Sequence, residues 1–133
     1  MPVIRTKSVW SDSEREDGLR ILVTRYVPRG CPTTKYDVWM ASLGPTEELL
    51  KHYKAGEVKW PDFATAYKEQ ILRDDDPLDE QNPRIKNHGQ KFTLRLLREL
   101  AHRQPITLLC HCGEQEPHCH RHLLKSLLES SKI

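Results

Sequence analysis

Three of the four cysteines and four of the seven histidines of the chain fall in residues 108–124, LLCHCGEQEPHCHRHLL. Thiolates and imidazoles bind metal ions, and a thiolate is also a nucleophile. The stretch therefore predicts a site that binds a metal ion or an anion, or that contains a reactive thiol. The simpler interpretation is a set of buried cysteines and a hydrogen-bonded histidine in the core.

The end of this stretch has the pattern of a helix over residues 116–130, with Pro117 in its first turn. At about 100° per residue, His120 lies on the leucine-rich face of the helix, with Cys119 and Arg121 on its two flanks. The free N–H groups and the dipole at the start of a helix favour an anion and lower the pKa of a thiol there. We therefore expect Cys119 and His120 to be the catalytic pair and Arg121 to bind an anion.

A second group of candidate residues follows the apolar run LRILV, where Arg25 and Arg29 lie in RYVPRG. In an open parallel sheet, ligands bind beyond the carboxyl ends of the strands. If the strand before these arginines and the strand before the cysteines are parallel, both segments end at the same edge. Arg25, Arg29 and Arg121 would then bind a phosphate or carboxylate group. The alternative is that these arginines pair with acidic side chains to hold loops in place.

Metal binding and thiol catalysis remain open as alternatives. Cys110, Cys112, Cys119 and His120 offer three thiolates and an imidazole, a set that suits zinc or iron. Cys119 or Cys110 with His120 as its base would instead make a thiol-dependent enzyme. The cysteine phosphatase pattern HC-x5-R is not present, because His118 stands where the arginine is required.

The composition indicates a globular protein with a single domain over residues 1–133. Hydrophobic residues make up 37% and charged residues 30% of the chain, and the formal net charge is +2. This small charge does not indicate a nucleic-acid partner. We identify neither a secretory signal nor an apolar run long enough to cross a membrane, so we expect a cytoplasmic protein with reduced thiols and no membrane partner.

The elements that must position these residues alternate between strands and helices. Short continuous apolar runs are typical of parallel strands that are covered on both faces. The pattern predicts an α/β fold with a small, largely parallel central sheet flanked by helices. The first helix after Pro45 is capped by Thr46 or Gly44, and Trp39 lies in a short element before it. The predicted strands are 3–10, 19–26 and 105–110. One predicted helix begins near residue 45, and three others span 59–74, 86–103 and 116–130. Residues 74–83 are predicted to form a loop.

Four segments of the chain, in order, resemble a known family: LRILVTRYVPRG, VWMASLGPTEEL, WPDFATAYKEQI and ITLLCHCGEQEPHCHRHLL. They are similar to the bacterial domain-of-unknown-function family 488, including its YeaO-like branch. The most specific matches are the arginine-containing strand exit and the sequence Cys119, His120, Arg121. Two positions depart from the family, since Thr24 replaces a common acidic residue and Val27 a common tryptophan. The resemblance implies a Rossmann-like three-layer fold and no settled activity.

The leading functional hypothesis is a cleft that binds a phosphorylated or otherwise anionic small molecule, such as a nucleotide derivative. Arg25, Arg29 and Arg121 would bind the anion, and Cys119 and His120 would be the reactive groups. Whether the protein is an enzyme is open at this point, as are its cofactor and its oligomeric state. The hypothesis requires the arginine segment and the cysteine segment to face each other across one helix N-terminus.

Overall fold

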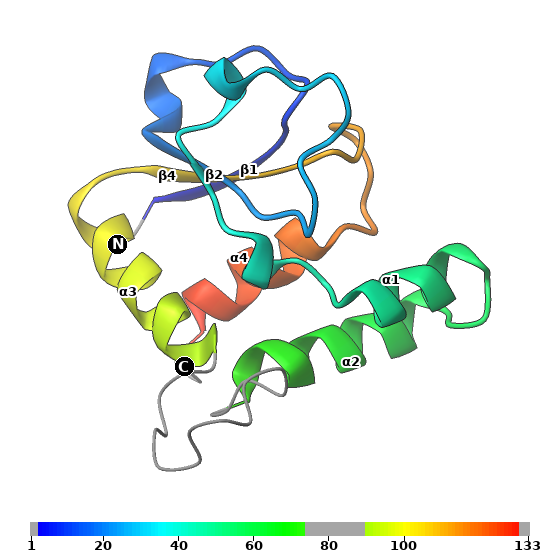
Figure 1. Cartoon of the computed structure of the whole chain (residues 1–133). Coiled ribbons are helices and arrows are strands. Elements are labelled where there is room, and N and C mark those ends of the chain that lie inside the picture. Colours follow the sequence, from blue (N-terminus) through cyan, green and yellow to red (C-terminus); the bar gives the residue numbers. More distant parts are fainter. Residues whose placement is uncertain (1–2, 74–89, 131–133) are drawn as a thin grey trace, which may run out of the picture.

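A four-stranded parallel sheet forms the centre of the protein, seen in a computed structural model that describes residues 3–73 and 90–130 (Figure 1). The strand order is β1-β4-β2-β3, and each neighbouring pair is parallel. The predicted α/β class with a parallel sheet is confirmed. The strands are β1 (Ile4–Ser8), β2 (Leu19–Leu22), β3 (Val38–Trp39) and β4 (Ile106–Cys110).

Strand β4 lies between β1 and β2 and is buried along its whole length. Its side chains alternate between the two faces of the sheet, as the pleat requires. Ile106 and Leu108 belong to the main core, whereas Leu109 packs with Val9 and Leu22 in a second, smaller core. Both faces of the sheet are therefore covered, which explains the continuous apolar run ITLLC.

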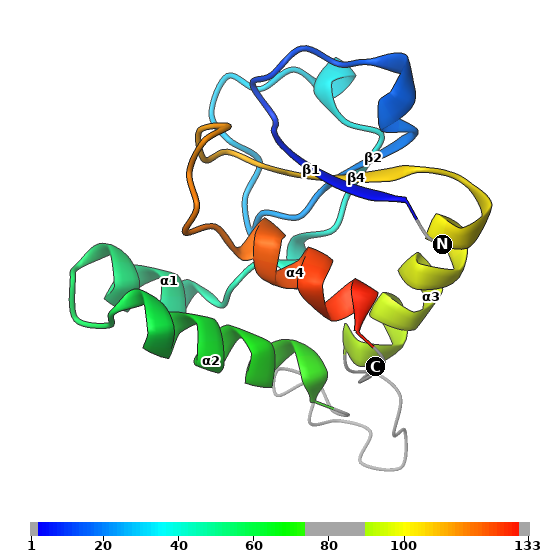
Figure 2. The same ribbon diagram turned by 180° about the vertical axis from the view of Figure 1, so that it is seen from behind.

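All four α-helices lie on one side of the sheet, and Figure 2 shows the same arrangement from behind. The opposite face is covered by loops that contain two short 3-10 helices, η1 and η2, which completes a three-layer fold. The α-helices are α1 (Glu47–Lys54), α2 (Trp60–Leu72), α3 (Gln90–Arg103) and α4 (His120–Glu129); the 3-10 helices are η1 (Arg15–Asp17), η2 (Thr33–Lys35) and η3 (Ala41–Leu43). Within the described residues, no helix combines the length and the apolar character that crossing a membrane requires.

Local sequence signals explain where two of the helices begin. Thr46 caps α1, because its side chain accepts a hydrogen bond from the backbone N–H of Leu49. Pro61 lies in the first turn of α2, where its missing N–H costs nothing. The predicted loop at 74–83 and the predicted helix start at 86–89 lie outside the described residues.

The short element predicted around Trp39 is strand β3, which is only two exposed residues long. Two predicted boundaries are wrong by several residues. Strand β2 ends at Leu22 rather than Tyr26. Helix α4 begins at His120, with extended Cys119 as its N-cap, rather than at Pro117. The loop before α4 is held at its other end, where Arg121 donates hydrogen bonds to the carbonyl groups of Cys112, Gly113 and Glu114.

The buried hydroxyl of Tyr67 ties α2 to the end of η3 by donating a hydrogen bond to the backbone oxygen of Leu43. We expect Tyr67→Phe to lower the free energy of unfolding by about 1–2 kcal/mol, because the buried carbonyl then lacks its partner. Urea unfolding measures this loss. Tyr36→Phe is the control, since the Tyr36 hydroxyl makes no hydrogen bond within the described residues; equal losses in both variants would contradict the prediction.

Candidate functional site

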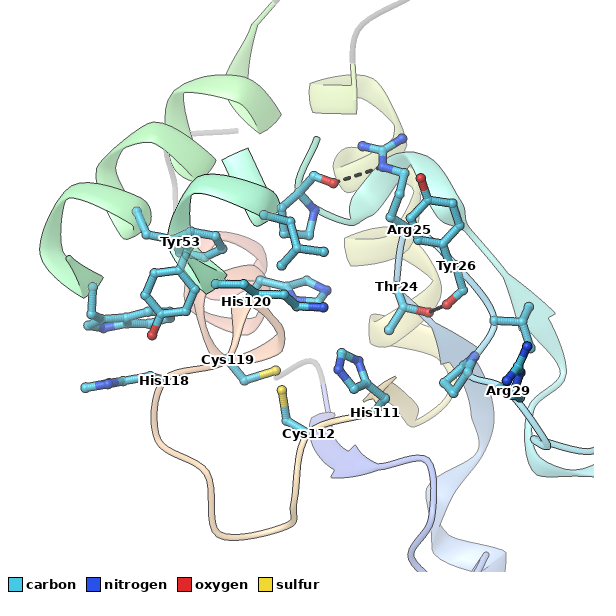
Figure 3. A pocket seen from close by; sticks show the side chains of 17 residues that line it. Thr24, Arg25, Tyr26, Arg29, Tyr53, His111, Cys112, His118, Cys119 and His120 are labelled. Carbon is cyan, nitrogen blue, oxygen red and sulfur yellow. Dashed lines mark hydrogen bonds between the residues drawn. The ribbon is translucent and has the colours of Figure 1, made fainter. Parts of the chain in front are cut away.

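A pocket of about 410 Å³ lies where β2 and β4 end (Figure 3). Residues 24–29 after β2 form one wall, and residues 111–112 after β4 together with 118–120 at the start of α4 form another. Helices α1 and α2 close the remaining side. Arg25, Arg29, Cys119 and His120 therefore surround one cavity, as the direction of parallel strands predicts. The functional roles expected for these side chains stay predictions.

His120 is buried in the first turn of α4 and faces the core, as the helical spacing predicts. Its Nε2 lies 2.7 Å from the backbone oxygen of Val23. A carbonyl oxygen accepts hydrogen bonds only, so Nε2 carries the hydrogen and Nδ1 is left as the acceptor of the neutral ring. Burial lowers the pKa of His120 to about 4. This neutral imidazole links the helix to the segment that carries Arg25.

The three clustered cysteines come together although they belong to different elements. Cys110 ends β4, Cys112 lies in the following loop and Cys119 caps α4, yet their sulfur atoms all lie within 4.8 Å of one another. The other cysteine, Cys31, lies outside this cysteine cluster. His120 was predicted as a fourth metal ligand, but its nitrogen atoms are not part of the group.

The electrostatics of the cysteine cluster differ from the prediction. We expected the helix N-terminus to lower the pKa of Cys119, but hydrogen bonding to Cys110 and Cys112 and burial raise it well above its usual value. The pKa of Cys112 is lowered instead, because the thiols of Cys110 and Cys119 donate hydrogen bonds to it. Cys112 is also less buried than the other two, so the thiolate is best solvated there.

Arg121 does not line the pocket, in contrast to its expected role in anion binding. Its side chain is only 1% exposed and points into the loop between β4 and α4. Nη2 donates hydrogen bonds to the backbone oxygens of Gly113 and Glu114 at 3.0 and 3.2 Å. Nη1 contacts the Cys110 sulfur and the Cys112 oxygen, both at 3.4 Å. Arg121 therefore holds the cysteine loop in place and has little capacity left for a ligand.

Arg25 lines the pocket, but part of its guanidinium is hydrogen-bonded to the backbone just before α1. Nε donates to the oxygen of Pro45 at 2.9 Å (Figure 3). Nη2 donates to the oxygen of Gly44 at 2.7 Å. This leaves Nη1 without a partner among the described residues. Gly44 is required at this contact, because a Cβ atom there would lie 2.4 Å from the backbone nitrogen of Arg25. One edge of the Arg25 guanidinium remains for a ligand.

The cations at the rim of the pocket have no acidic partners. Arg29 is exposed and forms neither a hydrogen bond nor an ion pair with any described residue, and the same holds for Lys54. Arg20, in contrast, forms a two-point ion pair with Asp37, so it has the structural role that the alternative interpretation assigned to Arg25 and Arg29. None of the residues that line the pocket is an aspartate or glutamate.

The sequence prediction missed the part of the wall that α1 provides. Tyr53 and Trp60 line the pocket beside Phe63, and their rings form a packed group with centroid distances of 4.6 to 6.0 Å. His118 stacks on Trp60 at 4.7 Å. The helical spacing identified Phe63, but the position of α1 relative to the sheet depends on packing that the local pattern does not contain.

The comparison with protein families assigns the chain to a known group. The family model DUF488-N3a, described as the active DUF488-N3 subclade, matches residues 4–132. The chain belongs to the DUF488 family. The DUF488 match includes every residue that lines the pocket and the whole cysteine cluster, and it confirms the resemblance identified from the sequence segments.

Relatives of this DUF488 chain include two uncharacterised proteins. YeaO of Escherichia coli K12 is 36% identical over 108 residues, which cover 80% of each chain. Rv3073c of Mycobacterium tuberculosis H37Rv is 29% identical over 70 residues, which cover 51% of this chain and 59% of the relative. No solved structure matches the chain. The family membership is therefore established, and an activity must be argued from the site.

Proposed function

We propose that the pocket binds an anionic small molecule that carries a phosphate group and a flat ring, as a nucleotide derivative does. The observation that supports this proposal most strongly is the charge of the lining, which includes Arg25, Arg29 and Lys54 and contains no acidic residue. Three fixed positive charges at one cavity attract an anion and disfavour a cation.

The side chain at position 24 contributes to this charge balance. Thr24 stands where the family resemblance implies an acidic residue, and its hydroxyl donates a hydrogen bond to the backbone oxygen of Tyr26. A carboxylate at this position would neutralise one of the neighbouring arginines. With threonine there, the positive charge of Arg25 and Arg29 is left for the ligand.

The size and remaining chemistry of the pocket suit a ligand as large as a mononucleotide. Small-molecule sites have volumes of roughly 300–1,000 Å³ and are mostly apolar with a few polar groups. The 410 Å³ cavity lies within that range. Leu50, Tyr53 and Trp60 supply an apolar wall for a ring, while Arg29 and the free edge of Arg25 supply donors for a phosphate. A ligand held between them lies against Cys112 and His120, where processing of the ligand would occur.

Calorimetric titration with nucleoside 5′-monophosphates and the matching nucleosides tests the proposal. At least one monophosphate is expected to bind roughly tenfold more tightly than its nucleoside, since a charged hydrogen bond contributes about 1.5 kcal/mol. Arg29→Gln should remove most of this difference and leave nucleoside binding unchanged. Higher salt should weaken binding of the monophosphate more than binding of the nucleoside, because salt screens the attraction between charges.

The matched control is Arg103→Gln, which removes the same charge from an exposed position at the end of α3. This variant should bind the monophosphate as the unmodified protein does. Absence of binding for every nucleotide tried, or the same loss of affinity in Arg103→Gln and Arg29→Gln, would contradict the proposal.

A further inference from the structure

The cysteine cluster has the spacing of a metal-thiolate site. In tetrahedral zinc sites the metal–sulfur distance is about 2.3 Å, which places two sulfur ligands about 3.8 Å apart. The sulfur atoms of Cys110, Cys112 and Cys119 already lie within 4.8 Å of one another. To reach a common ion, no pair of these sulfur atoms has to move closer by more than about 1 Å. Figure 3 shows the sulfurs of Cys112 and Cys119 turned toward each other beside the pocket.

Two hydrogen-bond donors lie against the Cys110 sulfur, where they could offset the charge of a metal-bound thiolate. The backbone N–H of Cys112 and Nη1 of Arg121 both donate to the Cys110 sulfur, each at 3.4 Å. Donors of this kind orient a metal ligand and offset its negative charge. The C-x-C spacing creates the first of these contacts, because the loop turns back over the sulfur directly after β4.

The charge of Arg121 gives independent support. Its guanidinium is 1% exposed, and no ion pair joins it to a carboxylate within residues 3–73 and 90–130. Arg121 contributes to the lowered pKa of the nearby Glu114 carboxylate, but that carboxylate accepts its hydrogen bonds from the backbone of Ser8 and the hydroxyl of Ser11, both at 2.7 Å, and not from the guanidinium. A buried cation needs a negative partner. Three thiolates around one divalent ion carry a net charge of −1, which balances Arg121.

One unpaired nitrogen atom of Arg121 also supports a negative charge at the cysteine cluster. Its Nε is buried and has no hydrogen-bond partner in the described part of the chain. Such an unpaired donor costs stability unless a negative charge lies close to it. A metal-thiolate group next to the guanidinium supplies that charge, whereas three neutral thiols do not.

We infer that Cys110, Cys112 and Cys119 together bind one thiophilic divalent ion, Zn²⁺ from the chemistry of the ligands, with an open coordination position toward the pocket. Cys112 and Cys119 line the pocket and Cys110 lies behind them, so the ion borders the cavity. Binding forms three metal–sulfur bonds and releases the remaining thiol protons to solvent. Three protein ligands and one exchangeable position are typical of catalytic rather than structural zinc. This inference stands on the cysteines and Arg121 and does not depend on the proposed nucleotide ligand.

The test is a titration of the full-length, untagged, reduced protein with Zn²⁺ after removal of metal by a chelator, with no nucleotide present. One tight site per chain is expected by calorimetry, and Co²⁺ should give a thiolate-to-cobalt charge-transfer band. Cys112→Ser should weaken Zn²⁺ binding by at least about 100-fold. This loss is larger than that expected when only a residue that hydrogen-bonds a metal ligand is removed. Cys31→Ser is the matched control, because Cys31 lies outside the cysteine cluster, and it should bind as the unmodified protein does.

A second measurement keeps the test decisive if Cys112→Ser does not fold. Zn²⁺ should slow alkylation of Cys112 by iodoacetamide in the unmodified protein and leave alkylation of Cys31 unchanged, as followed residue by residue with mass spectrometry. The absence of a stoichiometric ion, equal binding by Cys112→Ser, or no protection of Cys112 would overturn the inference. Arg29→Gln should retain the metal, so failure of the nucleotide proposal and failure of the metal site give different results.

Discussion

Replacing Arg121 with methionine should lower the free energy of unfolding by roughly 3–5 kcal/mol, because a hydrogen bond from a charged group contributes about 1.5–3 kcal/mol and several are lost together. The side chain is almost completely buried and donates to three backbone carbonyl groups and one sulfur atom. Methionine fills a similar volume but provides no donor. The carbonyls of Cys112, Gly113 and Glu114 then lose their shared partner, and any negative charge in the cysteine cluster loses its counter-ion.

Urea unfolding of reduced, metal-free protein measures this loss. Arg121→Lys should recover only part of it, because one ammonium group keeps the charge but does not reach acceptors on both sides of the loop. The control is Arg103→Met at an exposed position of α3, where a change below about 0.5 kcal/mol is expected. A loss for Arg121→Met as small as that of the control would show that the cysteine loop is held by other contacts.

Hydrogen exchange gives a second readout of the same variant. The amides of residues 112–119 should exchange faster in Arg121→Met, whereas those of β4 should stay protected by both neighbouring strands. This pattern would separate release of the cysteine loop from a general loss of stability.

The sequence was sufficient to predict the sheet and the segments that surround the pocket. Continuous apolar runs identified β2 and β4, and the rule that parallel strands end at one edge placed Arg25 and Arg29 opposite Cys119 and His120. These predictions depend on burial and chain direction, which hydrophobic patterning contains. The short element at Trp39 was predicted, but its strand type was not, because two exposed residues produce no alternating pattern.

The details of the site depended on contacts that no local pattern contains. Arginine is rarely buried, so the burial of Arg121 against loop carbonyls was not expected from its residue type. The pKa order of the thiols follows from three sulfurs meeting in space, and this contact outweighs the helix dipole at Cys119. Tyr53 and Lys54 reach the pocket because α1 packs on α2, which is a tertiary contact.

The junction between η1 and β2 is the site of the second large expected effect, because Gly18 has no room for a side chain. Its φ is +63°, and a Cβ atom would lie 2.0 Å from the backbone oxygen of Pro105. That oxygen accepts the N–H of Leu19, the contact that aligns the start of β2 with β4. Gly18→Ala must therefore adopt an unfavourable backbone conformation and also push two strands apart at their first pair.

We expect Gly18→Ala to lower the free energy of unfolding by about 4 kcal/mol or more, which combines backbone strain with a steric clash. Gly30→Ala and Gly56→Ala separate the two causes. Both glycines have a positive φ, +80° and +78°, but neither has a neighbouring atom within 4 Å of an added Cβ. Each of these two variants should lower the free energy of unfolding by only about 1–2 kcal/mol, the cost of the left-handed conformation alone. Similar losses in all three variants, measured by urea unfolding, would mean that Pro105 can move away.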